Sequence, residues 1–194
     1  MVSNKTVFLD SNVVAGIVAV GRDGNSSQKT TTNFKEWEKS ILSLISLVDK
    51  DPTTVELKAP TPICYELMAW NKEWFKIVTN DEYKPLFIYS SYGLTNKFIK
   101  IAAKYAFESQ IRTGSDNNSA KLKTMDPLLA AYSIVFDCPI LTENECDFPN
   151  SHFDVMGINL LNLVSSNDSN KNHRSILYLL KPKEEIRKKY SELF

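Results

Sequence analysis

Short apolar segments alternate with amphipathic helical segments along most of this chain. The apolar segments are too short for helices and are predicted to be strands, at residues 6–9, 55–59, 86–89, 138–142 and 155–161. Helices are predicted most clearly over residues 34–48 and 95–109, where apolar side chains recur every three or four residues. Because a helix between two strands returns the chain to the starting edge of the sheet, such strands run mainly parallel. The sequence therefore predicts an α/β fold with a mainly parallel central sheet.

Two further helices are predicted to begin at a polar residue that is followed by proline. In "TPICYELM", Thr61 is the expected N-cap and Pro62 the first helical residue, and in "DPLLAAY" Asp126 and Pro127 take the same positions. Polar stretches without apolar periodicity are predicted to be loops, at residues 21–33, 113–119 and 162–174. A basic segment covers residues 181–194.

The composition is that of an ordinary globular protein and favours no class of partner. Lys plus Arg and Asp plus Glu each number 23 among 194 residues, so the formal net charge is zero and any nucleic-acid-binding surface requires a local basic patch. The three cysteines, Cys64, Cys138 and Cys146, form no CxxC pair and are expected to be reduced thiols. No apolar run reaches the roughly 20 residues of a membrane-spanning helix, and Asp10 interrupts the only early apolar run. We therefore expect a soluble, cytoplasmic protein.

Polar side chains follow several of the predicted strands, at the edge where ligands bind in parallel sheets. Asp10 ends the first strand, and Glu66 lies about one turn into the helix after the second. Asp126 begins the helix that precedes the strand at 138–142. Further candidates lie directly after two of these strands: Asn12, Thr142, Asn144 and Asp147. Acids from four separate segments are thus expected to converge at one edge of the sheet.

Such a cluster of acids indicates a divalent cation, because like charges a few ångströms apart repel unless a positive charge compensates them. Mg²⁺ and Mn²⁺ prefer oxygen ligands and are commonly held by a few carboxylates together with water and substrate phosphates. A bound ion of this kind lowers the pKa of an attacking water and stabilises the charge that develops at a phosphodiester. The acid set therefore predicts metal-dependent hydrolysis of phosphodiester bonds.

Four segments in this order, "VFLDSNVV", "PTPICYELM", "KTMDPLLAAYSI" and "ILTENECDF", resemble the PIN-domain family of metal-dependent ribonucleases. The resemblance covers roughly residues 5–165 and implies a three-layer α/β/α sandwich that acts as an endoribonuclease with Mg²⁺ or Mn²⁺. It implies metal-binding and catalytic roles for four acids, Asp10, Glu66, Asp126 and Asp147, and supporting roles for Asn12, Thr142 and Asn144. Either Asp147 or Asn144 is the fourth ligand, and the motif leaves this choice open.

The resemblance divides the chain into a PIN-like nuclease domain at residues 1–165 and a C-terminal extension at 166–194. The extension is expected to pack on the same domain or to continue it. RNA is the expected substrate. Toxin-type members of the family further imply a cognate antitoxin protein as a partner, and a homodimer.

Two other functions fit parts of the pattern. A phosphohydrolase of the haloacid dehalogenase type also has an Asp at the end of its first strand, but it requires a second acid where this chain has Asn12. A PIN-like module that binds RNA or a protein without catalysis would share the fold. In isolation, Asp10 also fits a turn and Asp126 a helix cap. The two histidines, His152 and His173, have no partner at ligand or triad spacing and are predicted to be surface residues.

Overall fold

The structure, a computed structural model, describes residues 6–22, 39–70, 72–79, 96–108, 125–164 and 172–193. Its strands are β1 (Thr6–Leu9), β2 (Glu56–Lys58), β3 (Ile140–Thr142), β4 (Phe153–Val164) and β5 (Asn172–Pro182). They form one sheet in the order β2-β1-β3-β5-β4. β1 is parallel to β2 and β3, whereas β5 is antiparallel to β3 and β4. The α/β class is confirmed, and the sheet is mixed, with its parallel part at β2-β1-β3.

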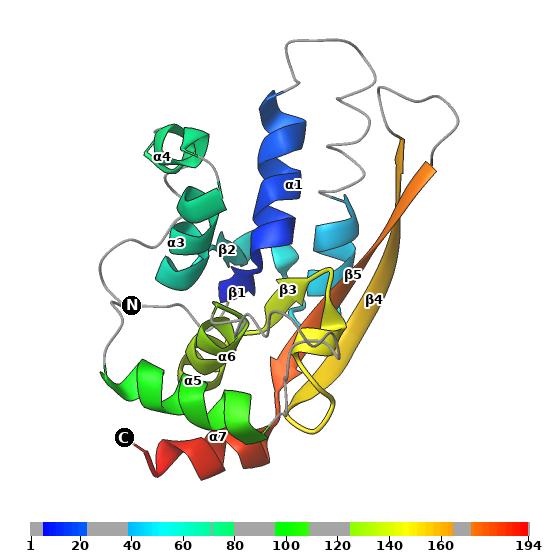
Figure 1. The fold of residues 1–194 in the computed structure, drawn as a ribbon. Coiled ribbons are helices and arrows are strands. Elements are labelled where there is room, and N and C mark those ends of the chain that lie inside the picture. Colours follow the sequence, from blue (N-terminus) through cyan, green and yellow to red (C-terminus); the bar gives the residue numbers. More distant parts are fainter. Residues whose placement is uncertain are drawn as a thin grey trace.

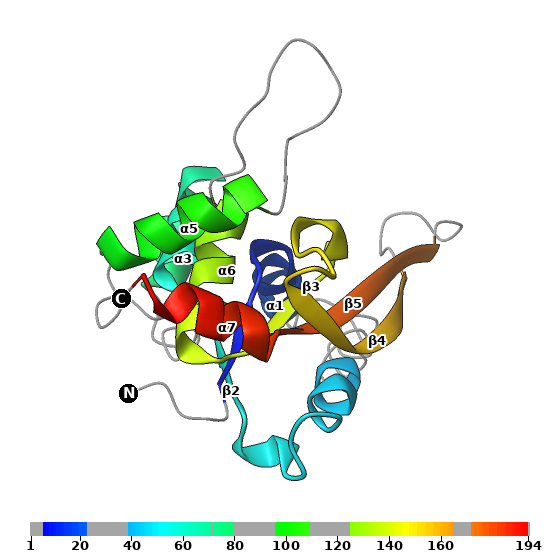
Figure 2. The same ribbon diagram turned by 90° about the horizontal axis from the view of Figure 1, so that it is seen from below.

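Helices lie on both sides of this sheet. They are α1 (Ser11–Arg22), α3 (Thr61–Trp70), α4 (Glu73–Val78), α5 (Asn96–Glu108), α6 (Met125–Phe136) and α7 (Glu184–Ser191), with short 3₁₀ turns at η2 (Pro52–Thr54) and η4 (Glu145–Asp147). Residues 39–45 are also helical. Figure 2 shows α3, α5 and α6 on one side of the sheet and the helix at 39–45 on the other, and Figure 1 shows the long β4–β5 hairpin. In the described ranges no helix is both long and apolar enough to cross a membrane.

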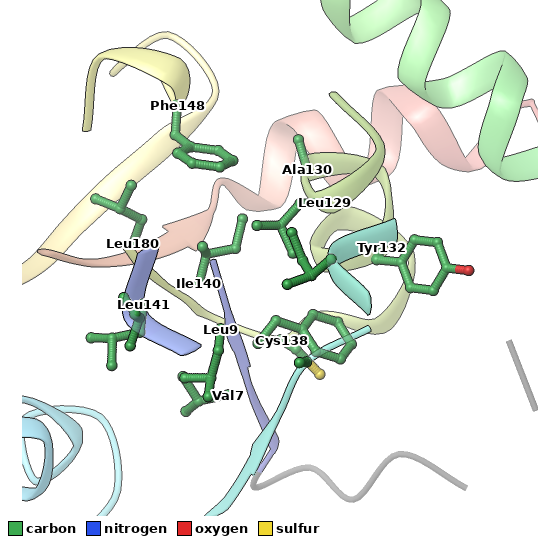
Figure 3. Close-up of a cluster of buried hydrophobic side chains, with 14 of the residues drawn as sticks. Val7, Leu9, Leu129, Ala130, Tyr132, Cys138, Ile140, Leu141, Phe148 and Leu180 are labelled. Atoms are coloured by element: carbon green, nitrogen blue, oxygen red, sulfur yellow. The ribbon is translucent and has the colours of Figure 1, made fainter. Parts of the chain in front are cut away.

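The core lies where α6 packs against the central strands. Phe8, Leu9, Ile140 and Leu141 are fully buried on β1 and β3, and α6 contributes Leu129, Ala130 and Tyr132, as Figure 3 shows for most of this cluster. α6 contacts α3, α5, α7 and β5. A helix surrounded in this way is apolar on nearly every face, which explains why its sequence shows no clear polar side. The first turn of α6, which carries Asp126, is therefore held in place from several directions.

Both predicted helix starts are too late, by one residue in α3 and by two in α6. In α3 the Cys64 N–H donates to the Pro60 carbonyl oxygen at 3.2 Å, so Pro60 and not Thr61 precedes the first turn. α6 begins at Met125, so the prediction that Asp126 is its N-cap is wrong, and Asp126 lies inside the first turn.

Most other predicted elements agree with the structure where it describes them. The strands predicted at 6–9, 55–59, 138–142 and 155–161 and the helix at 95–109 are present, and the helix predicted at 34–48 is observed at 39–45. The strand at 86–89, the loop at 113–119 and most of the loop at 21–33 lie outside the described residues. The predicted loop at 162–174 is wrong at both ends, because β4 continues to Val164 and β5 begins at Asn172. Asn162 pairs with Arg174 there, and a ladder of backbone hydrogen bonds does not require apolar side chains.

β5 lies inside the sheet, between β3 and β4, although the sequence beyond residue 165 shows no resemblance to the nuclease motifs. Leu177, Leu179 and Leu180 of this strand are fully buried. The antiparallel β4–β5 hairpin therefore completes the same core that the parallel strands form.

We expect Leu179→Ala to lower the free energy of unfolding by about 2–5 kcal/mol, because it leaves a cavity at a fully buried position. The control is Ile176→Ala, which changes a side chain of the same strand that is 38% exposed and should cost about 1 kcal/mol or less. Urea denaturation followed by circular dichroism measures both losses. Equal, small losses in the two variants would show that β5 is not part of the core.

Candidate active site

Asp10 links the end of β1 to the start of α1. Its backbone N–H donates to the Leu141 carbonyl oxygen of β3 at 3.0 Å, and its own carbonyl oxygen accepts the first helical hydrogen bond, from Val14, at 3.1 Å. Its side-chain Oδ1 accepts a hydrogen bond from the Ser11 N–H at 2.7 Å. The Asp10 carboxylate is only 4% exposed. Its place at the carboxyl end of a central parallel strand is the one that the sequence predicted.

Thr142 holds the second oxygen of this carboxylate. Thr142 ends β3, the neighbour of β1, and its Oγ1 donates to Asp10 Oδ2 at 2.6 Å. The same oxygen accepts a hydrogen bond from the Asn144 N–H at 2.9 Å. Each carboxylate oxygen of Asp10 thus has a hydrogen-bond donor, which restricts the side chain to one orientation.

Asn144 and Asp147 lie in the segment that follows β3 and interact with each other. Asn144 Nδ2 donates to Asp147 Oδ2, and Asp147 is 8% exposed at the end of η4. Of the two candidates for a fourth ligand, the carboxylate is the more buried and the amide holds it.

The negative charge of Asp147 acts on the Asp10 carboxyl group. Burial raises the pKa of Asp10, hydrogen bonds from Thr142 and Ser11 oppose this, and the negative charge of Asp147 raises the pKa further. No lysine or arginine of the described residues is among the causes of this shift. Two buried acids from distant parts of the chain therefore interact electrostatically beyond the ends of β1 and β3.

Asp126 is connected to the same region through Tyr105 of α5. Tyr105 is fully buried, and burial is the main cause that raises the pKa of its hydroxyl. Tyr190 and the charges of Asp126 and Asp147 raise that pKa further, so both carboxylates act electrostatically on this hydroxyl. Tyr105 Oη also donates a hydrogen bond to the Asp147 backbone carbonyl oxygen at 2.8 Å.

Glu66 lies in the second turn of α3, and its Oε2 is buried. α3 packs against α1, which follows Asp10, and against α6, which carries Asp126. Asn12, by contrast, is exposed in the first turn of α1. Of the three predicted supporting residues, Thr142 and Asn144 have side chains that bond directly to candidate acids.

Within the described ranges, no three His, Cys, Asp or Glu side chains lie together as a metal-binding group. Electrostatic interactions connect Asp147 with Asp10, and both Asp126 and Asp147 with the Tyr105 hydroxyl. The chemistry of these donors fits Mg²⁺ or Mn²⁺, because Mg²⁺ is commonly held by one or two carboxylates and keeps several waters or substrate phosphates as its other ligands. Asp10 and Asp147 would hold such an ion, with Asp126 and Glu66 on the adjoining helices.

A small cavity of about 130 Å³ lies at the opposite edge of the parallel strands. It is lined by residues at or before the strand starts, among them Thr6, Val55 and Pro139, together with Asp137 and Lys181. The acids lie at the carboxyl ends of the same strands, so this cavity is not part of the candidate site.

A buried polar network supports Tyr105 and was not predicted from the sequence. His152 is 5% exposed, so the prediction that it is a surface residue is wrong. The Nδ1 atom of His152 lies 2.8 Å from Ser151 Oγ. Its Nε2 atom lies 3.4 Å from Tyr190 Oη and 3.8 Å from Glu108 Oε2. The ring also packs edge-on against Tyr105. Burial lowers the pKa of His152. These partners come from three separate segments, so no spacing in the sequence indicates them.

We expect Tyr105→Phe to lower the free energy of unfolding by about 1–3 kcal/mol, because it removes the buried hydrogen bond to the Asp147 carbonyl. The matched control is Tyr65→Phe, at a side chain that is 62% exposed, and it should change stability by less than about 0.5 kcal/mol. Denaturant titration of both variants measures the difference. Equal stability of the two variants would contradict the role assigned to the Tyr105 hydroxyl.

The raised pKa of Asp10 predicts a destabilising charge at neutral pH. The folded protein binds the Asp10 proton more strongly than the unfolded chain does, so proton binding at Asp10 stabilises the fold. This stabilisation is fully present below the ordinary pKa of aspartate and is lost as the pH rises through the raised pKa of the folded state. Asp10→Asn should therefore raise the melting temperature at pH 7 in EDTA, since an amide can bond to both Ser11 and Thr142 without a charge.

Glu56→Gln is the control for this measurement, because Glu56 is an exposed acid on β2. Its melting temperature should stay at the wild-type value across the pH range. A melting temperature of Asp10→Asn below that of the wild type would mean that the carboxylate stabilises the fold.

Comparison with known proteins assigns no family to this geometry. The chain matches no protein-family model, no curated protein and no solved structure. Its function therefore has to be inferred from the site itself.

Proposed function

We propose that this protein is a PIN-like endoribonuclease that uses Mg²⁺ or Mn²⁺ at an acidic site formed by Asp10, Glu66, Asp126 and Asp147. One observation carries the proposal: Asp10 and Asp147 are both buried beyond the carboxyl ends of β1 and β3, and the negative charge of Asp147 is among the causes that raise the pKa of Asp10. Burying two like charges costs stability. A divalent cation would offset this cost, because it compensates the charge of both carboxylates.

The arrangement of the parallel strands supports the PIN-like interpretation. β2, β1 and β3 are parallel neighbours with helices on both sides of the sheet, and Asp10, Thr142 and η4 follow the ends of two of them. The antiparallel β4–β5 hairpin departs from the mainly parallel sheet that the resemblance implies. The proposal therefore rests on the acids and on the parallel part of the sheet.

The residues of this chain would act mainly by positioning. Thr142 and Ser11 fix both oxygens of Asp10, and Asn144 holds one oxygen of Asp147. When bound, the cation would lower the pKa of an attacking water and stabilise the charge on the phosphate. Asp126, in the first turn of the buried helix α6, and Glu66, on α3, would complete the acidic site around the water and the phosphate.

The basic segment near the end of the chain gives little support to a role in RNA binding. Four of its side chains lie within ion-pair distance of acids: Lys183 with Asp154, Arg187 with Asp137, Lys188 with Glu184, and Lys189 with Glu108. These pairs lower the net charge that the segment presents to a phosphate backbone. Contact with the substrate is therefore expected mainly at the acidic site, through the bound cation.

We expect the purified protein to cleave single-stranded RNA in Mn²⁺ and to lose activity in EDTA. Asp126→Asn and Asp147→Asn should each lower the cleavage rate by at least ~100-fold, because each removes a negative charge from the proposed acidic site. Glu145→Gln is the matched control, since Glu145 is an exposed acid of η4 next to the site. Undiminished cleavage by Asp126→Asn would overturn the site assignment.

Mn²⁺ binding can be measured without activity. The melting temperature of the wild type should rise with millimolar Mn²⁺, because a ligand that binds only the folded state stabilises it. Asp10→Asn should show a smaller rise. A wild type that neither binds Mn²⁺ nor cleaves RNA would instead favour a non-catalytic binding module.

A further inference from the structure

β4 is a long edge strand. It spans Phe153–Val164 and lies last in the sheet order, with β5 as its hydrogen-bonded neighbour among the described strands. At about 3.3 Å per residue, its 12 residues extend over roughly 40 Å. The outer side of such a strand presents backbone N–H and C=O groups that can pair with another strand.

The two faces of the β4–β5 hairpin differ. On one face the helix at 39–45 packs closely: a Cβ at Gly157 would overlap Leu47 and lie 3.0 Å from Leu44 Cδ2. On the other face the side chains of Ile158 and Leu160 are 59% and 49% exposed. Ile176, the cross-strand partner of Leu160, is 38% exposed. One face is therefore covered by the chain itself, and the other presents an apolar row.

β4 lacks the features that usually protect an edge strand from pairing. Its sequence, "FDVMGINLLNLV", contains no proline or lysine, and Asp154 is its only charged residue. The bulge between Val155 and Gly157 interrupts the ladder near one end and leaves residues 158–164 in regular register with β5. Proline, lysine and bulges are common protective devices, so residues 158–164 form a pairing edge that carries none of them and to which no other described strand is hydrogen-bonded.

We propose that β4 is the interface of a homodimer, in which β4 of a second copy pairs with it in antiparallel orientation. This proposal is independent of the proposed nuclease activity. A two-fold axis across the strand makes the pairing antiparallel and presents the same residues on both sides, as a closed dimer requires. The apolar row of one copy then continues onto the other, and the two sheets form one.

Charge favours a second copy over a nucleic acid or a charged peptide. Residues 155–164 carry no charge, and the whole chain has zero formal net charge, so two copies do not repel each other at this edge.

Sedimentation equilibrium of the full chain over a concentration series tests the proposal, with Ile158→Lys and Leu160→Lys as the disrupting variants. The wild type should be a dimer at micromolar concentration, and each variant should weaken dimerisation by at least ~100-fold, because it places like charges opposite each other in a desolvated pair. Ile99→Lys is the matched control, at an isoleucine of α5 that is 51% exposed, and should leave the dimer unchanged. Thermal melts check that all variants fold.

Hydrogen exchange separates strand pairing from simple contact between apolar faces. In a strand-paired dimer, amides of residues 158–164 that do not bond to β5 become protected as the concentration rises. A wild-type monomer at several hundred micromolar would overturn the proposal and leave the edge to a different partner. A dimer that survives both β4 variants, or one without added protection in β4, would also overturn it.

Discussion

The pairing of β1 with β3 is the contact on which the candidate site depends. Asp10 and Thr142 are 132 residues apart in the sequence, and they meet because these two parallel strands end at the same edge of the sheet. The hydrogen bond between their side chains satisfies one oxygen of a carboxylate that is almost fully buried. Without this pairing, Asp10 would be an acid at a strand end with no defined surroundings.

The remaining acids are placed by helices that pack on this strand pair. α6 is buried between the sheet and three other helices, so the position of Asp126 in its first turn is determined by core packing. Tyr105 donates a hydrogen bond to the backbone of Asp147, and its ring packs against His152. His152 in turn lies within hydrogen-bond distance of Tyr190 in α7. A network that includes residues near the end of the chain thus supports an acid of the candidate site.

Local patterns predicted much of the fold. Apolar period and length identified β1, β2, β3, part of β4, and α5, because these properties depend on neighbouring residues alone. The same patterns failed at β5 and the end of β4, where Asn162, Asn172 and Arg174 resemble a loop. A strand in a hairpin is stabilised by its partner's backbone, and a single stretch of sequence does not contain that information.

The sequence by itself determined the α/β class, the carboxyl ends of β1 and β3 and the residue types of the candidate site: Asp10, Glu66, Asp126 and Asp147, with Thr142 as a supporting residue. Only the tertiary structure decided which of them interact, since distance and burial depend on the strand order. It also decided that His152 is buried and that Tyr105 contacts Asp147, because these contacts join segments with no relation in sequence. The mixed sheet was decided in the same way: β5 takes its place by pairing with β3 and β4, and pairing is a property of the folded chain.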